Sequence, residues 1–259
     1  SPQFGEAFRN RFDIVSGKEK GKELKDLTEL ALSGILYYVA QVLNHLIEKN
    51  EFQTGSGKSK SLRICLGGKA STLYKIVFED SEDQEGLSKM IEKVTGGIFK
   101  SIGIVFTDTP KHEVSYGLLV DKTGSTDLDL TDRSHETILG EDVMVGKSKI
   151  GVVSDLDADK QWRVKDISQL KNFLKYLQAY SKIPVTLTKK FEGDLEGKIN
   201  AELKNGQSRA LDLKRNMQSV EGDDSLAEIQ KTSSIIEPVF IQALKQVINE
   251  VATGKLKIK

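Results

Sequence analysis

The residues best suited to chemistry lie where a short apolar run ends in two glycines. The run Leu62–Leu66 is bounded by turn residues, which predicts a buried strand, and Gly67 and Gly68 follow it directly. Two glycines at the end of a strand let the main chain turn sharply and approach a ligand with no Cβ in the way. Lys69 and Ser71 then begin a run with helical spacing, whose unpaired N–H groups and positive dipole end suit a phosphate or ribose-phosphate. An ordinary tight strand-to-helix turn accounts for the same residues.

Two other motifs point to phosphate or calcium but lack required residues. The stretch Gly55-Ser-Gly-Lys-Ser59 ends like a Walker loop, yet Phe52 stands where that loop needs its first glycine, and a helix precedes it where a strand is required. We interpret it as a linker. The alternating carboxylates of Asp155–Lys160 suit calcium, but Lys160 occupies the position where the EF-hand turn needs glycine, and Asp166 stands in place of the bidentate glutamate. A solvated acidic loop is the favoured interpretation.

Composition excludes several classes of protein and limits the partners. The 259 residues include 38 basic and 38 acidic side chains, so no global charge attracts nucleic acid or an anionic membrane. The single Cys65 excludes an intramolecular disulfide and fits a reducing cytoplasm, and three dispersed histidines offer little for a zinc site. We interpret Cys65 as a small hydrophobe in a buried strand. No uninterrupted apolar run reaches the length of a membrane span, so we expect a cytoplasmic protein with no nucleic-acid partner and no membrane span.

The spacing of apolar residues in the first half alternates between helical and strand-like. It predicts the order helix, strand, helix, helix, strand, helix over residues 23–49, 62–66, 69–78, 87–94, 102–106 and 111–120. An acidic loop at 79–86 separates the second and third helices, and Gly96 and Gly97 end the third. This order predicts neighbouring strands of an α/β sheet joined by crossover helices. Residues 1–22 are polar and basic, which predicts an arm.

In the second half of the chain, the spacing of apolar residues is less regular. Residues 121–141 predict a linker or extended loop, and residues 122–259 as a whole predict an additional α+β region of unknown role. The predicted elements are short strands around 143–145 and 150–153, a helix at 166–180, an edge strand at 183–187, weaker helices at 193–203 and 226–230, and a terminal helix at 234–251. The chain begins Ser-Pro-Gln-Phe without methionine, so we expect it to be cut from something longer.

The glycine junction resembles the adenosine motif of the actin-like ATPase superfamily, which includes actin, sugar kinases, DnaK-type chaperones and bacterial plasmid-segregating filaments. In that family an apolar strand ends in Gly-Gly-x-Ala/Ser and opens a helix beside the nucleotide. Here Ile64-Cys-Leu66 corresponds to the strand, Gly67 and Gly68 to the glycine pair, and Ala70 or Ser71 to the small residue. The stretch from Thr109 to Leu119, with its Gly-Leu pair, fits the later helix of the family. The likeness covers about residues 20–120.

This resemblance implies the fold and the ligand. The fold would be α/β, an actin-like (ribonuclease-H-like) nucleotide-binding subdomain at 23–121, and the cofactor of the intact protein would be ATP with Mg. The implied nucleotide-binding residues are Gly67, Gly68, Lys69, Ser71, Lys111 and Glu113. None of the family's phosphate loops or its catalytic carboxylate is visible before Glu23. The resemblance therefore implies the C-terminal half of an actin-like or chaperone-like ATPase, inert alone, whose partner is the missing N-terminal half.

A second hypothesis belongs to another class. A non-catalytic scaffold or protein-interaction domain would keep the same fold without nucleotide. Its docking surfaces would be the acidic loop 79–86, the charged segment 121–166 and the amphipathic terminal helix. A sugar or acid kinase is a third interpretation, and it needs the same upstream half together with a substrate pocket.

Overall fold

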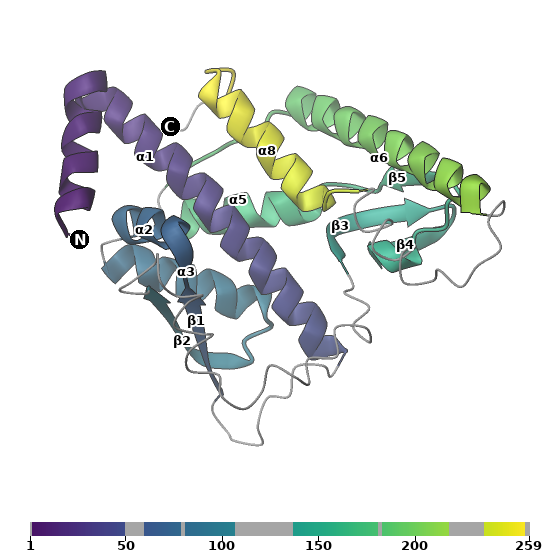
Figure 1. Ribbon diagram of the computed structural model, residues 1–259, viewed down its shortest axis with the longest axis horizontal. Coiled ribbons are helices and arrows are strands. Elements are labelled where there is room, and N and C mark those ends of the chain that lie inside the picture. Colours follow the sequence, from purple (N-terminus) through teal and green to yellow (C-terminus); the bar gives the residue numbers. More distant parts are fainter. Residues whose placement is uncertain are drawn as a thin grey trace. The chain divides into compact units, whose positions relative to one another are not determined.

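A computed structural model describes residues 2–49, 60–78, 81–106, 137–180, 183–217 and 236–256 (Figure 1). Within these ranges the side chains of 2–23 are not described. The helices predicted at 111–120 and 226–230 and the Gly55–Ser59 stretch lie outside the described residues. The chain divides into two compact units: unit 1 comprises Ser1–Leu128, Tyr176–Val185 and Lys257–Lys259, and unit 2 comprises Asp129–Lys175 and Thr186–Leu256. The protein is mixed α/β with small sheets, in agreement with the predicted class.

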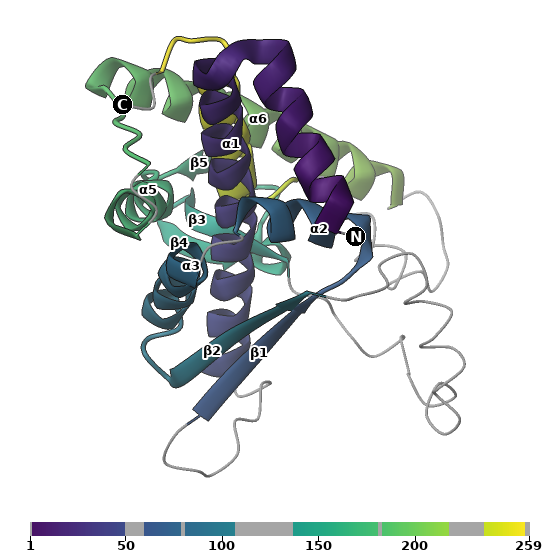
Figure 2. The same cartoon turned by 90° about the vertical axis from the view of Figure 1, so that its left-hand side faces the viewer.

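Unit 1 contains a parallel pair of strands joined by two helices. Its elements are α1 (Pro2–Glu48), β1 (Lys60–Leu66), α2 (Gly68–Val77), α3 (Ser81–Val94) and β2 (Phe99–Phe106). Strands β1 and β2 lie side by side in Figures 1 and 2, and their parallel pairing aligns Leu62 with Ile102 and Leu66 with Phe106. Parallel neighbours need a crossover connection, which α2 and α3 provide. The order predicted from helix to second strand is therefore confirmed.

Two boundaries in unit 1 differ from the prediction. Helix α1 begins at Pro2, so residues 2–22 are helical and the predicted arm is wrong. Helix α3 begins at Ser81, so most of the predicted acidic loop forms its first turns. Carboxylates stabilise the positive end of a helix, which explains why an acidic stretch starts α3 where we expected a loop. The predicted stop is confirmed, because Gly96 and Gly97 take φ values of 66° and 70° after the last turn.

The core of unit 1 forms where α1 and α3 pack together. Leu30, Leu36 and Tyr37 of α1 are at most 1% exposed, and Ile91 of α3 is fully buried. Helix α3 also packs close to the end of α5, since a Cβ added at Gly86 would lie 3.1 Å from the Cβ of Tyr180. Glycine at this position therefore permits a close approach of two backbones.

The segment Leu24–Glu48 of α1 is long and apolar enough to cross a membrane by length and composition alone. Serine, glutamine, asparagine and histidine interrupt it, which is why no uninterrupted run was visible in the sequence. Of its most apolar window of 18 residues, 39% is buried. The core helix of a soluble protein and an N-terminal signal sequence meet the same criterion, so the finding does not assign the helix to a membrane.

Strand β1 is less buried than its sequence predicts. Leu62, Ile64 and Leu66 are half-buried, whereas Arg63 and Cys65 on the opposite face are exposed. The interpretation of Cys65 as a buried small hydrophobe is therefore wrong. The physical reason is that parallel strands normally have both faces covered, whereas here the described residues cover only one.

Unit 2 contains a three-stranded antiparallel sheet and helices. Its strands are β3 (Ile138–Val145), β4 (Ser148–Val152) and β5 (Trp162–Val164), in the order β4-β3-β5, with a 3-10 turn η1 at Val153–Asp155. Its helices are α6 (Lys189–Met217) and α8 (Val239–Ala252), and α5 (Ser168–Tyr180) gives its last turn, from Tyr176, to unit 1. Strands at 143–145 and 150–153 and helices at 166–180 and near 234–251 are confirmed.

Other predictions in this half need correction. Residues 138–141 belong to β3, so the predicted linker ends before them. Strand β5 has only three residues and was missed, and α6 extends well beyond the predicted 193–203. The predicted edge strand at 183–187 does not form, since only Val185 makes an isolated bridge. Pro184 has no N–H to donate to a ladder, which explains the loss.

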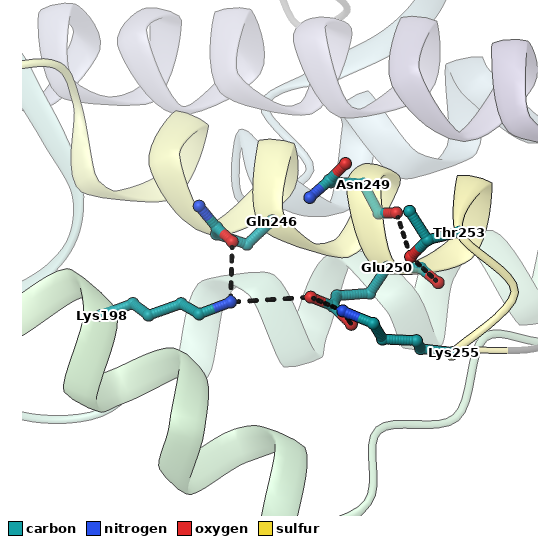
Figure 3. Close-up of polar contacts among 6 residues, drawn as sticks. All are labelled: Lys198, Gln246, Asn249, Glu250, Thr253 and Lys255. Carbon is teal, nitrogen blue, oxygen red and sulfur yellow. Dashed lines mark hydrogen bonds and ion pairs between the residues drawn. The ribbon is translucent and has the colours of Figure 1, made fainter.

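A buried glutamate joins α6 and α8 in unit 2. Glu250 of α8 is 7% exposed, and its carboxylate lies 3.6 Å from the Lys198 ammonium and 3.3 Å from that of Lys255 (Figure 3). Lys198 also donates to the Gln246 side chain at 3.3 Å. Two cations thus balance one buried carboxylate, which keeps the cost of burying it low.

Helix α6 also covers the edge of β5, as Figure 1 shows. The Asn200 Oδ1 accepts a hydrogen bond from the Val164 N–H at 2.8 Å, and the Gln207 Nε2 donates to the carbonyl oxygens of Ala158 and Lys160. An edge strand has unpaired backbone groups, and the Asn200 side chain satisfies one of them in β5, while Gln207 bonds to the loop that precedes the strand.

We expect Asn200→Ala to lower the free energy of unfolding by about 1 to 2 kcal/mol, because a partly buried N–H loses its acceptor. Chemical denaturation followed by Trp162 fluorescence measures this directly, since the chain has one tryptophan and β5 contains it. Asn205→Ala, at an exposed position of the same helix, is the matched control and should change stability by less than about 0.5 kcal/mol. Equal losses for the two variants would contradict the edge-covering role.

Candidate functional site

The predicted strand–glycine–helix junction is present in unit 1. Strand β1 ends at Leu66, Gly67 follows, and α2 begins at Gly68. Because β1 and β2 are parallel and Leu66 pairs with Phe106, the carboxyl ends of both strands lie at the same edge of the sheet. Ligands in open α/β sheets bind outside the carboxyl ends of the strands, so the junction lies at the edge where a ligand is expected.

The beginning of α2 is open and uncapped. Gly67 is the N-cap residue, with φ −109° and ψ 175°, and no side chain caps the helix. Gly67 is also exposed. The first N–H groups of a helix have no partner within the helix, so an anion at Gly67 would find donors and the positive end of the dipole.

The rest of α2 is firmly anchored to α1. The Tyr74 hydroxyl donates to the Leu32 carbonyl oxygen at 3.2 Å, and the Tyr74 and Phe78 rings stack at 5.9 Å. Burial raises the pKa of Tyr74 to about 12, so the hydroxyl remains a donor over the physiological range. A fixed helix holds its N-terminal N–H groups in one place, which favours binding because less ordering is needed. This anchor was not predicted from the sequence, although the i, i+4 spacing of Tyr74 and Phe78 indicates that the two rings are neighbours on one helix face.

The predicted site residues differ in where the structure places them. The structure brings Gly67 and Gly68 to the edge of the sheet. Ser71 lies one turn into α2 and is 2% exposed, so its hydroxyl belongs to the interior and is not open to solvent. The Lys69 side chain lies outside the described side chains, and Lys111 and Glu113 lie outside the described residues.

The acidic loop at Asp155–Lys160 is organised by its own contacts. The Asp157 carboxylate accepts the Asp159 N–H at 3.0 Å and pairs with the Lys160 ammonium at 2.8 Å. The Trp162 indole N–H donates to the Asp157 carbonyl oxygen at 2.7 Å. In the part of the chain that the structure describes, no three His, Cys, Asp or Glu side chains gather as metal ligands would.

A cavity of about 400 Å³ lies between α6 and α8 in unit 2. Its lining mixes charges of both signs with amides and two isoleucines, from Lys198, Ile199, Glu202, Arg209, Ile236, Glu237, Gln242, Lys245 and Gln246. Lys198 pairs with Glu250 and Lys245 with Glu237, so these cations already have carboxylate partners. Neither lysine therefore offers an unpaired charge that would select an ionic ligand.

Comparison with known proteins identifies no relative. No family model, no curated protein and no solved structure matches this chain.

Proposed function

We propose that this chain binds an adenine nucleotide at the β1–α2 junction, as the C-terminal half of an actin-like or chaperone-like ATPase. Gly67 and Gly68 lie beside the ribose and α-phosphate, and the N-terminal N–H groups of α2 donate to the phosphate. The intact protein supplies the phosphate loops, so the chain alone binds without hydrolysis. The observation that carries the proposal is the exposed, uncapped start of α2 directly after a strand of a parallel pair.

The burial of Ser71 narrows the proposed contacts. A hydroxyl that is 2% exposed does not reach a ligand without a change in packing, so main-chain groups provide the contacts that the described residues offer. The described side chains around Gly67 supply no set of oxygen ligands for Mg²⁺, so the proposal concerns nucleotide binding only.

Isothermal titration with ATP tests the proposal. We expect saturable binding of ATP that competes with ADP, and weaker binding of adenosine, because adenosine has no phosphate for the start of α2. A folded sample that gives no heat with ATP or ADP would favour the scaffold function. Binding of inorganic tripolyphosphate as tight as that of ATP would count against recognition of the nucleoside.

Gly67→Asp gives a more specific prediction. The φ and ψ of Gly67 are those that aspartate adopts at N-caps, so the variant should fold and gain about 0.5 to 1 kcal/mol from capping and from the dipole. The new carboxylate occupies the anion position, so ATP binding should be lost. A variant that is more stable yet does not bind separates binding from folding.

Two matched variants control this experiment. Gly67→Asn has nearly the same shape without the charge, and it should weaken binding less than aspartate does. Gly193→Asp adds the same charge in α6, where a Cβ meets no atom within 4 Å, and it should leave binding unchanged. Retention of ATP binding by Gly67→Asp would exclude the start of α2 as the site.

A further inference from the structure

The outer face of the unit 2 sheet displays cations in a regular arrangement. Lys149 and Arg163 both pair with Met144, so the three side chains form one cross-strand row on the same face. Lys165 follows β5 directly, and its N–H donates to the Asp142 carbonyl oxygen at 2.9 Å, so Asp142 and Lys165 continue the pairing as the next row. We call these five residues the basic sheet face. The inner face carries Val143, Val145, Trp162 and Val164, all of them buried.

The basic sheet face is open to solvent. Lys149, Arg163 and Lys165 are exposed, and Met144 between the first two is half-buried. Gly151 of β4 lies two residues beyond Lys149, and a Cβ added there would meet no atom within 4 Å. No described element therefore packs over this part of the sheet.

Charge on this face is only partly balanced. Asp142 pairs with the Lys149 ammonium at 2.7 Å. Arg163 and Lys165 make no ion pair with any described residue. Among the described residues of the basic sheet face, three cations thus stand against one carboxylate, which gives this face a positive charge on a chain whose net charge is zero.

We propose that the basic sheet face docks an acidic polypeptide segment with an apolar residue between its carboxylates. The apolar side chain covers Met144. The carboxylates pair with Arg163 and Lys165, and one of them replaces Asp142 as the partner of Lys149. Charge complementarity supports this occupant, and the half-buried methionine at the centre of the row supports the apolar contact.

The chemistry of the face favours a peptide over nucleic acid. Single-stranded nucleic acid binds sheet faces by stacking bases on aromatic side chains, and neither row contains an aromatic residue. Asp142 in the second row would repel phosphates. A peptide avoids this repulsion more easily, because it can have a neutral side chain near Asp142, whereas nucleic acid carries a phosphate at every nucleotide.

A fluorescent peptide that contains Glu-Ser-Leu-Ser-Glu once tests this proposal, since alternate residues of an extended chain place Glu, Leu and Glu on one side. Fluorescence anisotropy should show binding to the full chain at about 50 mM salt and several-fold weaker binding at about 500 mM. The same peptide with glutamine in place of glutamate should not bind. Absence of binding by the acidic peptide at low salt would overturn the proposal.

Charge reversal locates the binding. Arg163→Glu with Lys165→Glu should weaken binding of the acidic peptide by about tenfold or more and should allow a lysine-containing peptide to bind. The matched control, Lys189→Glu with Lys190→Glu, reverses two exposed lysines at the start of α6 and should change affinity less than about twofold. Circular dichroism verifies that both variants fold. Equal weakening in both would show non-specific attraction and would overturn the proposal.

Two more measurements separate this proposal from its alternatives. Met144→Ser should weaken binding even at high salt, where the apolar contact remains, and an unchanged affinity would contradict the role of Met144. A labelled single-stranded DNA of equal length should bind less tightly than the peptide. DNA that binds more tightly, and loses affinity with Arg163→Glu and Lys165→Glu, would assign the face to nucleic acid instead.

Discussion

Phe240→Ala is expected to lower the free energy of unfolding of unit 2 by about 3 to 5 kcal/mol, the usual cost of removing a fully buried phenylalanine side chain. Phe240 of α8 is 0% exposed, as is Phe173 of α5. Their ring centroids lie 5.9 Å apart at an angle of 83°, an edge-to-face contact. The variant therefore loses both apolar burial and a ring contact. Chemical denaturation monitored by Trp162 fluorescence gives the magnitude.

Leucine variants separate the ring contact from burial. Phe173→Leu and Phe240→Leu retain much of the volume, and a double-mutant cycle between them should give a coupling energy of about 0.5 to 1.5 kcal/mol. Phe191→Ala, at a half-buried position of α6, is the control and should cost clearly less than Phe240→Ala. A coupling energy near zero would mean that the edge-to-face geometry adds nothing beyond burial.

The local signals of unit 1 were readable in the sequence. The apolar run Leu62–Leu66, the glycine pair at 67–68 and the glycines at 96–97 mark a strand end, a helix start and a helix end by backbone chemistry alone. These signals depend on neighbours in the chain, so one sequence is enough to predict them. The parallel pairing followed because two strands separated by helices need a crossover.

The burial of particular residues was not readable in this way. Cys65 has the same neighbours in a buried or an exposed strand, and its exposure depends on what covers the sheet, which is a non-local property. Ser71 in the same way appeared suited to a ligand, whereas packing of α2 places it in the interior. The candidate site was thus predicted in its main chain and not in its side chains.

Short edge strands and buried charges were also missed. Strand β5 has three residues, Trp162–Val164, and its edge is completed by Asn200 of α6 far along the chain. Glu141 of β3 is buried on the inner face of the sheet, the face that also carries Val143 and Val145. The alternation of buried and less buried residues along β3 places Glu141 on the inner face. Only the position of α5 explains why an acidic side chain is found there.

Glu141 accepts hydrogen bonds from the start of α5. Its Oε1 accepts the Leu170 N–H at 2.6 Å and its Oε2 accepts the Gln169 N–H at 2.9 Å, while Asp166 accepts the Ser168 N–H at 2.9 Å. The N–H groups at the helix start are therefore satisfied by the oxygens of two acidic side chains. Glu141→Ala removes two acceptors at once, and we expect it to cost about 2 to 5 kcal/mol near pH 5, because buried donors are left unsatisfied.

The ionisation of Glu141 makes stability depend on pH. Burial raises its pKa to about 8, against the lowering effect of the two N–H groups and with smaller repulsion from Asp166 and Asp142. The usual pKa of 4.5 applies to the unfolded chain, so between about pH 5 and 8 the folded state holds a proton that the unfolded state has lost. Unfolding then releases a proton, and the free energy of unfolding falls as pH rises, by at most about 1.4 kcal/mol per pH unit.

Glu141→Gln tests this assignment. Glutamine cannot ionise, but its side chain has only one acceptor oxygen, so one of the two N–H groups at the start of α5 loses its partner. Near pH 5 the variant should therefore be less stable than the original chain by about 1 to 3 kcal/mol. In the variant, position 141 should no longer contribute to the fall in the free energy of unfolding between pH 5 and 8. The variant should become the more stable of the two proteins toward pH 9. Urea denaturation at several pH values, followed by Trp162 fluorescence, measures the two profiles. If the original chain instead gained stability relative to the variant as pH rises, the carboxylate would be ionised in the folded state, and the bonds to the start of α5 would outweigh burial.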